Sequence, residues 1–251
     1  MRLQLTGKVV VVTGGSRGIG RAVAEGMAAA GADVVVASRK LEACRAAADQ
    51  IAATTGRRAL PVACHVGRWE DCDALVETVY SEMGRCDVLV NNAGMSPLYP
   101  DLASVTEELY DKTHAVNARG PFRLAALFGT RMAGGDGGLI INISTTGSLH
   151  PAAFDLPYAM AKAGLNALTL GLAGAWPGKV RANVVLPGAF DTDITQAWGE
   201  GAKEQAAATN PSGRIGVPAD LVGICVLLAS DAGAYLNGAQ INVDGGAART
   251  L

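Results

Sequence analysis

Short runs of consecutive apolar residues alternate along the chain with longer stretches that have helical periodicity. Most of the runs are continuous rather than alternating, and several are rich in Val and Ile. This pattern is typical of strands that are buried on both faces, as in a parallel sheet covered by helices. The expected strands are Val9–Val12, Val34–Ala37, Ala59–Ala63, Val88–Val90, Leu139–Ile143, Val180–Leu186 and Ala239–Val243.

Helical candidates fill the intervals between the expected strands. Repetition of strand and helix in this order predicts an α/β fold: one doubly wound, Rossmann-like parallel sheet of about seven strands, with right-handed crossovers and helices on both faces. The candidates are Gly18–Ala30, Leu41–Thr55, Trp69–Met83, Thr106–Asn117, Pro121–Met132, Tyr158–Gly174 and Ala219–Ala229.

We expect a single domain over residues 1–251, because nothing in the pattern marks a second one. The one long stretch without clear periodicity covers residues 188–216. Loops of this length in compact domains are often active-site lids, so we expect a substrate loop or lid within the domain. The helix-forming stretch Trp198–Ala208 inside it argues against a disordered linker.

Composition narrows the class of protein. The 251 residues are 49% hydrophobic and 18% charged, which suits a folded globule with a sizeable core. The net charge is −2 without any block of like charge, so we expect no nucleic-acid partner. The sequence shows no secretory leader and no apolar run near the ~18 residues of a membrane span. The five cysteines show no CxxC pairing, which favours free thiols in the cytoplasm and no metal site.

The first expected strand runs directly into the glycine-rich turn Thr13-Gly14-Gly15-Ser16-Arg17-Gly18-Ile19-Gly20, which opens a helix. Glycine lets phosphates approach the backbone, and a helix N-terminus offers free N–H groups and a partial positive charge. Ordinary turns also use glycine, but the order of strand, turn and helix supports a dinucleotide site. Its expected contacts are Gly14, Ser16, Arg17, Gly18, Ile19 and Gly20.

The end of the second expected strand indicates which dinucleotide binds. NAD-binding proteins usually have a carboxylate there for the ribose 2′-hydroxyl. This chain has Ser38-Arg39-Lys40 instead. Arginine can bind a 2′-phosphate through two hydrogen bonds and serine can add a third, whereas a carboxylate would repel it. With Arg17 facing the same phosphate, Ser38 and Arg39 predict NADP(H).

Tyr158 and Lys162 lie four residues apart on an expected helix, and therefore on one face of it. A free tyrosine has a pKa of about 10 and is a poor base near neutrality. A nearby ammonium favours the phenolate, so we expect Lys162 to lower the pKa of Tyr158. Tyr158 is then placed to move a proton to or from a substrate oxygen as a general acid or base.

From Gly7 to Gly246, an ordered set of motifs resembles the short-chain dehydrogenase/reductase family. The resemblance implies that the segment with Asn91, Ala93 and Gly94 stabilises the sheet and borders the adenosine, and that Pro187, Gly188 and Thr192 hold the nicotinamide end. Besides the glycine turn, the motifs are Asn91-Asn92-Ala93-Gly94, Val116-Asn117-Ala118, Tyr158-Ala159-Met160-Ala161-Lys162, Pro187-Gly188-Ala189-Phe190-Asp191-Thr192 and Asn242-Val243-Asp244-Gly245-Gly246.

The resemblance also implies the catalytic roles. Lys162 would bind the nicotinamide ribose as well as act on Tyr158, and Asn117 would hold a water that relays protons to Lys162. The family usually has serine thirteen residues before the tyrosine, where this chain has Thr145. Threonine keeps the hydroxyl, so Thr145 is expected to donate a hydrogen bond to the substrate oxygen. Ser144 is the reserve for that role if the loop register differs by one residue.

His65 is a second departure from the family pattern. It stands, with Val66 beside it, where an aspartate often meets the adenine amino group. A neutral histidine nitrogen that accepts this bond and a ring that only lines the adenine pocket are both open. A metal-ligand role is not expected, because His114 and His150 offer no ligand spacing with His65.

Together these features predict an oxidoreductase that transfers a hydride between NADP(H) and a carbonyl or secondary alcohol substrate by a Tyr-Lys mechanism. A 3-oxoacyl-thioester reductase is an alternative within this class, and Arg119, Arg123 and Arg131 would form its basic patch. A catalytically idle NADP-binding sensor or scaffold is an alternative outside it. The sequence leaves the substrate and the direction of reaction open; its candidate pocket residues are Phe154, Leu156, Phe190 and Trp198.

The expected helix after Tyr158 is rich in alanine and glycine, which permits close approach of another element. Packing on the chain's own sheet is one explanation. Enzymes of the resembling family pair this helix with a second subunit, so a homotetramer is expected, with a dimer as the second option.

Overall fold

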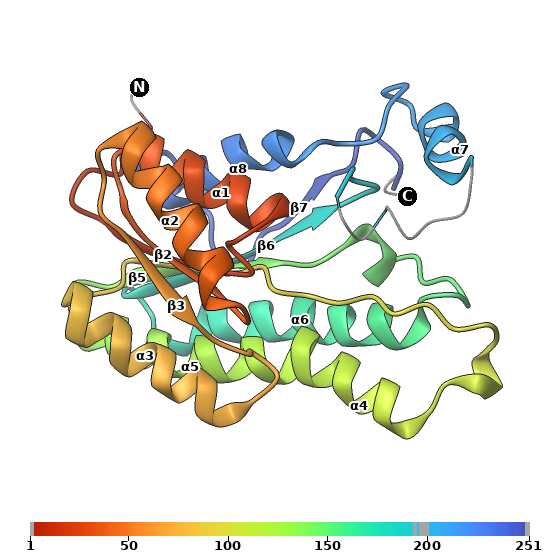
Figure 1. Cartoon of the computed structure of the whole chain (residues 1–251), viewed down its shortest axis with the longest axis horizontal. Coiled ribbons are helices and arrows are strands. Elements are labelled where there is room, and N and C mark those ends of the chain that lie inside the picture. The colour runs from red at the N-terminus through yellow and green to blue at the C-terminus, as the bar shows by residue number, and fades with distance from the viewer. Residues whose placement is uncertain (1–2, 193–194, 196–200, 249–251) are drawn as a thin grey trace.

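Seven parallel strands form one central sheet in the computed structural model, which describes residues 3–192, 195 and 201–248 (Figure 1). The strand order is β3-β2-β1-β4-β5-β6-β7. The chain therefore moves outward from β1 to β3 and then returns to place β4 on the other side of β1. In open α/β sheets, ligands bind at the carboxyl ends of the strands where the order reverses in this way. The strands are β1 Val9–Thr13, β2 Asp33–Ser38, β3 Ala59–Ala63, β4 Val88–Asn91, β5 Gly138–Ile143, β6 Val180–Pro187 and β7 Gln240–Val243.

Helices cover both faces of the sheet, which confirms the predicted doubly wound fold. Figure 1 shows α1, α2 and α8 on one face and α3 to α6 on the other. None of the helices in the described ranges combines the length and the apolar character needed to cross a membrane. The α-helices are α1 Gly18–Ala29, α2 Leu41–Thr55, α3 Trp69–Met83, α4 Glu107–His114, α5 Gly120–Ala133, α6 Leu156–Ala175, α7 Ala202–Thr209 and α8 Val222–Ala229, and short 3₁₀ turns cover Leu102–Ser104, Thr146–Ser148, Pro218–Leu221 and Asp231–Gly233.

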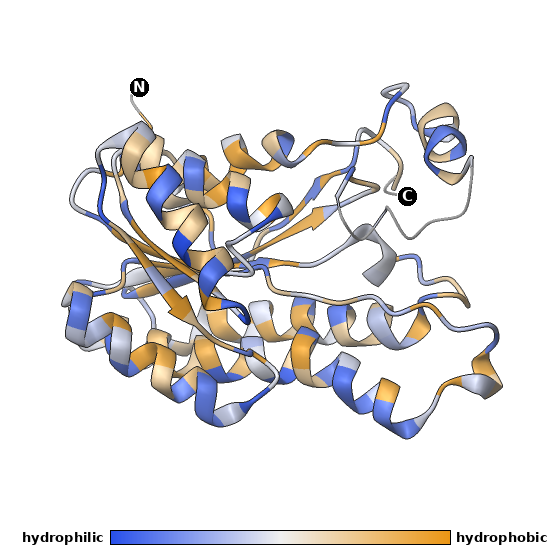
Figure 2. Cartoon of the chain, viewed as in Figure 1, coloured by the Kyte–Doolittle hydropathy of each residue, from blue (hydrophilic) through white to orange (hydrophobic). Residues whose placement is uncertain are grey.

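The continuous apolar strands are explained by two hydrophobic cores, one on each face of the sheet. Val10 and Val12 of β1 pack on the side of α1 and α2, together with Met27. Val9 and Val11 of the same strand pack on the side of α3 and α5. Because both faces are buried, all four positions from Val9 to Val12 are apolar, and Figure 2 shows the resulting hydrophobic sheet between helices with polar outer faces.

The stretch expected to form two helices, Thr106–Asn117 and Pro121–Met132, is continuous in the structure. Helix α4 passes through one π-helical turn, Ala115–Arg119, into α5. Pro121 has no N–H to donate, and its ring would clash with the Asn117 carbonyl four residues earlier in a regular α-helix. The wider π turn accommodates the proline, so the helix continues where the sequence indicated a break.

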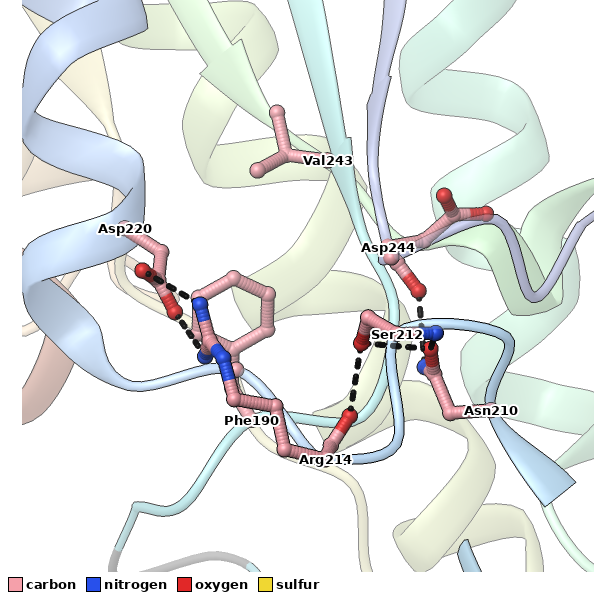
Figure 3. A pocket seen from close by; sticks show the side chains of 9 residues that line it. Phe190, Asn210, Ser212, Arg214, Asp220, Val243 and Asp244 are labelled. Atoms are coloured by element: carbon pink, nitrogen blue, oxygen red, sulfur yellow. Dashed lines mark hydrogen bonds and ion pairs between the residues drawn. The ribbon is translucent and has the colours of Figure 1, made fainter. Parts of the chain in front are cut away.

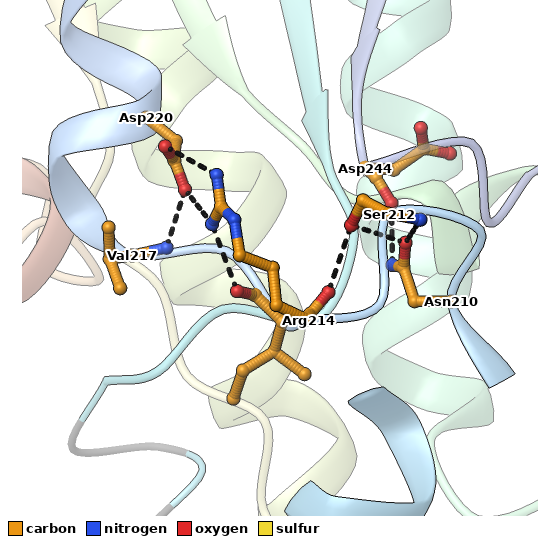
Figure 4. Close-up of polar contacts among 7 residues, drawn as sticks. Asn210, Ser212, Arg214, Val217, Asp220 and Asp244 are labelled. Carbon is orange, nitrogen blue, oxygen red and sulfur yellow. Dashed lines mark hydrogen bonds and ion pairs between the residues drawn. The ribbon is translucent and has the colours of Figure 1, made fainter. Parts of the chain in front are cut away.

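The two ends of the 188–216 segment meet beside β6. Phe190 and Gly216 form a parallel bridge, and the Asp191 N–H donates to the Gly216 carbonyl at 2.8 Å. Figure 4 shows the end of this segment: Arg214 pairs with Asp220 at 2.6 Å, and Asn210 donates to the Asp244 carbonyl at 2.8 Å. Within the segment, α7 overlaps the helix predicted over 198–208, and residues 193–194 and 196–200 lie outside the described ranges. The lid function of the segment stays a prediction.

Candidate active site

The turn between β1 and α1 has the backbone geometry that a diphosphate site needs. Gly14 and Gly18 have φ angles of +65° and +54°, which residues with a Cβ rarely adopt. A Cβ on Gly20 would overlap the Asn92 side chain and the Gly14 carbonyl. Helix α1 begins at Gly18, so its N-terminal N–H groups lie at the carboxyl edge of the sheet. Ser16 and Ile19 are half-buried in this turn, whereas Arg17 is exposed.

Thr13 and Asn92 hold the glycine turn against the end of β4. The Thr13 hydroxyl accepts hydrogen bonds from the N–H groups of Asn92 at 3.0 Å and Ala93 at 3.1 Å. The Asn92 amide donates in turn to the Thr13 carbonyl at 2.9 Å. Neither residue was among the expected site residues. Their place inside the glycine turn and the Asn-Asn-Ala-Gly motif was visible in the sequence, but their pairing across 79 positions of the chain was not.

Asn91 differs from its neighbour. Its buried side chain donates to Asn142 Oδ1 at 2.9 Å and to the Pro121 carbonyl at 3.4 Å. The side chain therefore joins β4 to β5 and α5 and is directed into the protein. This geometry favours a structural role for Asn91 and leaves the contacts with adenosine to the less buried Ala93 and Gly94.

The carboxyl ends of β1 and β2 bring together the side chains expected at a 2′-phosphate. Ser38 Oγ donates to Ser16 Oγ at 2.9 Å, so the glycine turn and the end of β2 are in contact. Arg39 follows Ser38 directly and, like Arg17, is exposed. Among the described residues, this edge presents two serine hydroxyls and two guanidinium groups, and no carboxylate occupies the end of β2.

His65 follows β3, and its hydrogen bonds argue against the acceptor role considered for it. Nδ1 already accepts the N–H of Gly67 at 3.2 Å, and the backbone N–H of His65 donates to Asp71 at 2.9 Å. In the neutral ring Nε2 then carries the proton and is a donor. The ring is therefore better suited to lining the adenine pocket, beside the buried Val66. No set of three or more His, Cys, Asp or Glu side chains in the described ranges is arranged to hold a metal ion.

Tyr158 and Lys162 lie on one face of α6, as their spacing predicts. Lys162 Nζ is 5.8 Å from the centroid of the Tyr158 ring and donates to the Ile143 carbonyl, at the end of β5, at 2.7 Å. Lys162 is only 2% exposed. Gly94 borders the same place, because a Cβ on it would lie 3.6 Å from Lys162 Nζ and 3.0 Å from Asn117 Oδ1. The four residues thus meet between the ends of β4 and β5.

The expected effect of Lys162 on Tyr158 is not what the isolated chain shows. Burial raises the pKa of Tyr158, and the nearby Asp155 carboxylate raises it further. Burial also lowers the pKa of Lys162 from 10.5 to about 7, so this side chain is only partly charged near neutrality. Burial therefore dominates both groups, Lys162 is not among the causes that act on Tyr158, and the prediction that Lys162 lowers the Tyr158 pKa is wrong for the chain alone.

Thr145 and Ser144 are clearly distinguished by their contacts. Thr145 Oγ1 accepts the N–H of Gly147 at 3.2 Å, which leaves its O–H available to donate. Ser144 is 4% exposed, and its hydroxyl donates to the Lys162 carbonyl at 3.2 Å. Ser144 is therefore used in joining β5 to α6, and the geometry favours Thr145 as the donor to a substrate oxygen.

The side chain of Asn117 is fully buried and engaged with the protein. Its amide donates to the Met95 carbonyl at 2.8 Å and to the Thr113 carbonyl at 2.9 Å, while its Oδ1 accepts the Met95 N–H at 3.2 Å. These bonds fix the loop after β4 to the π turn. Because these bonds occupy the Asn117 side chain, a water held at this residue, as expected from the resemblance, would have to form its hydrogen bonds with the backbone of the π turn.

The segment after β6 reaches the glycine turn. Thr192 Cγ2 lies 3.9 Å from the position of a Cβ on Gly18, and the Thr192 N–H donates to Thr195 Oγ1 at 3.0 Å. Pro187 ends β6 and accepts the Thr146 hydroxyl through its carbonyl at 3.4 Å. A Cβ on Gly188 would lie 2.8 Å from Asp244 Cβ, so only glycine fits there without a shift. Pro187, Gly188 and Thr192, which were expected at the nicotinamide end, therefore lie between the end of β5 and the glycine turn that precedes α1.

Tyr99 joins two segments that border the catalytic residues, and no pattern in the sequence indicated this role. Its hydroxyl donates to the Ala153 carbonyl at 2.6 Å and accepts the N–H of Leu156, the first residue of α6, at 2.8 Å. The loop after β4 and the loop before α6 are therefore linked. Phe154, between Ala153 and Leu156 in the chain, is 67% exposed.

Phe190 does not lie where the sequence suggested. It is 5% exposed and belongs to the core under α8, and its ring stands against Gly216, where a Cβ would lie 2.7 Å from Cζ. Figure 3 shows Phe190 lining a small cavity with Arg214, Val243 and Asp244, and Tyr158 is not among the residues that line it. Phe190 is therefore a packing residue at the base of the 188–216 segment. Trp198, also expected in the pocket, lies outside the described ranges.

Comparison with known proteins gives consistent matches over the whole chain. A family described as "Enoyl-(Acyl carrier protein) reductase" matches residues 13–248. The 2-dehydro-3-deoxy-D-gluconate 5-dehydrogenase of Pseudoalteromonas atlantica is 36% identical over 98% of this chain and 97% of its own length. The human "Dehydrogenase/reductase SDR family member 4" is 35% identical over 96% of this chain and 88% of its own. The structure of L-sorbose reductase from Gluconobacter frateurii, complexed with NADPH and L-sorbose, superposes with a TM-score of 0.93 at 31% identity and covers 100% of both chains.

Proposed function

Because the chain belongs to the short-chain dehydrogenase/reductase family, we propose that it transfers a hydride between NADP(H) and a carbonyl or secondary alcohol group of a small molecule. The observation that carries this proposal is the position of Tyr158 and Lys162 on one face of α6, with Lys162 bonded to the Ile143 carbonyl at the end of β5, two residues before Thr145. NADP(H), when bound, supplies or accepts the hydride.

The residues of the site fit NADP(H). Gly14 and Gly18 adopt the positive φ angles that this turn requires, and α1 presents its N-terminus there. Arg17 and Arg39 would pair with a 2′-phosphate beside the contacting hydroxyls of Ser16 and Ser38. NADPH is also the dinucleotide in the L-sorbose reductase complex.

In the reduction direction, Tyr158 would donate the proton that the substrate oxygen requires. Its raised pKa keeps the phenol protonated at neutral pH, which suits a general acid. Thr145, with its O–H free, would donate to the same oxygen and stabilise the charge that develops there. Lys162 would bind the nicotinamide ribose and return the proton to Tyr158. Its pKa of about 7 allows it to gain and lose a proton near neutral pH.

The test is the variant Tyr158→Phe, which removes only the hydroxyl. We expect NADPH affinity, measured by fluorescence titration, to stay within about twofold of the wild type. We expect turnover of reducible carbonyls, measured as loss of nicotinamide absorbance, to fall by roughly 10³-fold or more, because proton transfer and its positioning are lost together. Turnover near that of the wild type would refute the assignment.

The thioester alternative has less support. The arginines that were expected to form a basic patch for an acidic carrier are occupied: Arg123 pairs with Asp73 at 2.6 Å, Arg131 pairs with Glu77, and Arg119 donates to the Gly67 carbonyl. Arg123 and Arg131 are thus paired with carboxylates of α3, and Arg119 with the loop that precedes this helix. A catalytically idle sensor is the remaining alternative. NADPH binding without turnover of any ketone or dicarbonyl in a panel would support it.

We also propose that the chain forms a homotetramer, with a dimer as the second option. The outer face of α6 supports this, because it carries exposed apolar and small side chains, among them Met160 and Leu170, the latter 52% exposed. A Cβ on Gly164, Gly171 or Gly174 of this helix would meet nothing within 4 Å. Such a surface allows a second helix to approach closely and bury the exposed leucine.

A cytoplasmic location is part of the same proposal. All five cysteines are free and buried. Thiols that stay unpaired suit a reducing compartment.

A further inference from the structure

Asp155 is an acidic side chain beside the catalytic residues with no assigned task. It occupies the position before the first turn of α6, where an aspartate usually caps the helix, yet its side chain makes no capping bond. Its Oδ1 instead accepts the N–H of Ala152 at 3.2 Å. The carboxylate is thereby turned back toward the loop that precedes the helix.

The position of Asp155 places a negative charge next to the group that would bind the substrate oxygen. A Cβ on Gly147 would lie 3.3 Å from Asp155 Oδ2 and 3.5 Å from Thr145 Oγ1. The carboxylate and the Thr145 hydroxyl therefore border the same glycine. The charge also acts on Tyr158, three residues later on α6, whose pKa it raises.

Asp155 is half-buried, and within the described part of the chain no ion pair balances its charge. Burial raises its pKa, and the groups that oppose this are the backbone N–H groups of Ala152 and Asp155 itself. No lysine, arginine or histidine of the described ranges forms an ion pair with it. Lys162, the nearest catalytic cation, is bonded to Ile143 instead. A partly buried carboxylate without an ion-pair partner is stabilised by hydrogen-bond donors and repels other anions.

We propose that Asp155 determines substrate specificity: it accepts hydrogen bonds from hydroxyl groups adjacent to the reacting carbon and disfavours substrates that carry a carboxylate or phosphate there. The inference rests on the proposed function and names its substrate class, uncharged hydroxylated ketones and the corresponding polyols. A hydroxyl that donates to a carboxylate contributes more than one that donates to a neutral oxygen. An anion at the same place meets like charge in a medium that screens it poorly.

The experiment compares two matched carbonyl compounds, dihydroxyacetone and hydroxypyruvate, which differ by a hydroxymethyl group in place of a carboxylate. 2,3-Butanedione serves as an uncharged reference without hydroxyl groups. NADPH-dependent reduction is measured for the wild type and for Asp155→Asn, which keeps the shape of the side chain and an oxygen for Ala152. Asp136→Asn is the control, because it removes an exposed carboxylate at the opposite, amino-terminal end of β5, which begins at Gly138.

We expect the wild type to prefer dihydroxyacetone to hydroxypyruvate in kcat/KM by at least tenfold. Asp155→Asn should reduce this preference by about tenfold or more, a change of ~1.4 kcal/mol, chiefly through a lower KM for hydroxypyruvate. Asp136→Asn should leave the ratio unchanged. If 2,3-butanedione is reduced but Asp155→Asn does not alter the ratio, the inference fails while the proposed function stands. If no carbonyl compound is reduced by the wild type, both fail.

Discussion

Lys162 allows the energetic cost of the site to be tested. Burying its charge should reduce the stability of the folded chain, even though the charge serves catalysis. We expect Lys162→Met to abolish turnover and to stabilise the NADP-free protein at neutral pH. In the folded chain the pKa of Lys162 is about 7, against an ordinary value of 10.5. Between these values the unfolded chain binds a proton that the folded chain does not, so folding of the wild type becomes more favourable as pH rises.

The magnitude follows from the two pKa values. The difference between them corresponds to roughly 4 kcal/mol at pH 7 and about 1.4 kcal/mol at pH 9.5. The variant also loses the 2.7 Å bond to the Ile143 carbonyl, which costs about 1–2 kcal/mol. The net expectation is a variant that is more stable by about 3 kcal/mol at pH 7, and an advantage close to zero at pH 9.5.

The assay is urea unfolding of both proteins without cofactor at pH 7, 8.5 and 9.5. In thermal unfolding at pH 7, the Tm of Lys162→Met should exceed that of the wild type by roughly 2–4 °C for each kcal/mol of added stability. Lys179→Met is the matched control, because Lys179 is an exposed lysine that also donates to a backbone carbonyl, that of Gly135. Its effect should be small and independent of pH. A stability difference between the wild type and Lys162→Met that does not change from pH 7 to 9.5 would show that Lys162 carries its charge in the folded chain without cost.

Two further predictions concern the cofactor and the assembly. Ser38→Asp should lower the affinity for NADPH by about tenfold or more relative to NADH, because it introduces a carboxylate beside Ser16 and the expected 2′-phosphate; fluorescence titration with both dinucleotides checks this, and an unchanged ratio would contradict the assignment. Leu170→Glu should weaken the homotetramer by placing a charge on the exposed face of α6, whereas an exposed residue elsewhere, as in Glu82→Gln, should not. Light scattering that finds only monomer in the wild type would rule the assembly out.

The sequence was sufficient for the fold because the fold depends on a regular pattern. Strands buried on both faces are apolar at most positions, and each expected strand lies within a residue or two of its place in the sheet. The helix through Asn117 shows the limit of this reasoning. A proline indicated a break, but whether a helix ends or widens at a proline depends on what its neighbours can accommodate, and local pattern does not contain that information.

The site was predictable in its residue types and less so in its energetics. Spacing alone placed Tyr158 and Lys162 on one face, but the direction of the Tyr158 pKa shift depends on how deeply both groups are buried, which spacing does not reveal. Phe190 illustrates the same difficulty, since an aromatic residue in a loop is equally compatible with a pocket wall and with the core. Tyr99 and Asn92 act through partners far along the chain, and although a motif marks Asn92, no local pattern reveals these partners.

The hydroxyl of Tyr99 has a consequence for how such an enzyme can acquire new substrates. One oxygen atom binds both the Ala153 carbonyl and the first N–H of α6. The loop after β4 and the loop before α6 therefore cannot be reshaped independently. An insertion or a bulkier residue in the loop after β4 would shift the start of the helix that carries Tyr158. Evolution toward a larger loop after β4 would therefore alter the position of Tyr158, the proposed general acid, unless Tyr99 were replaced first.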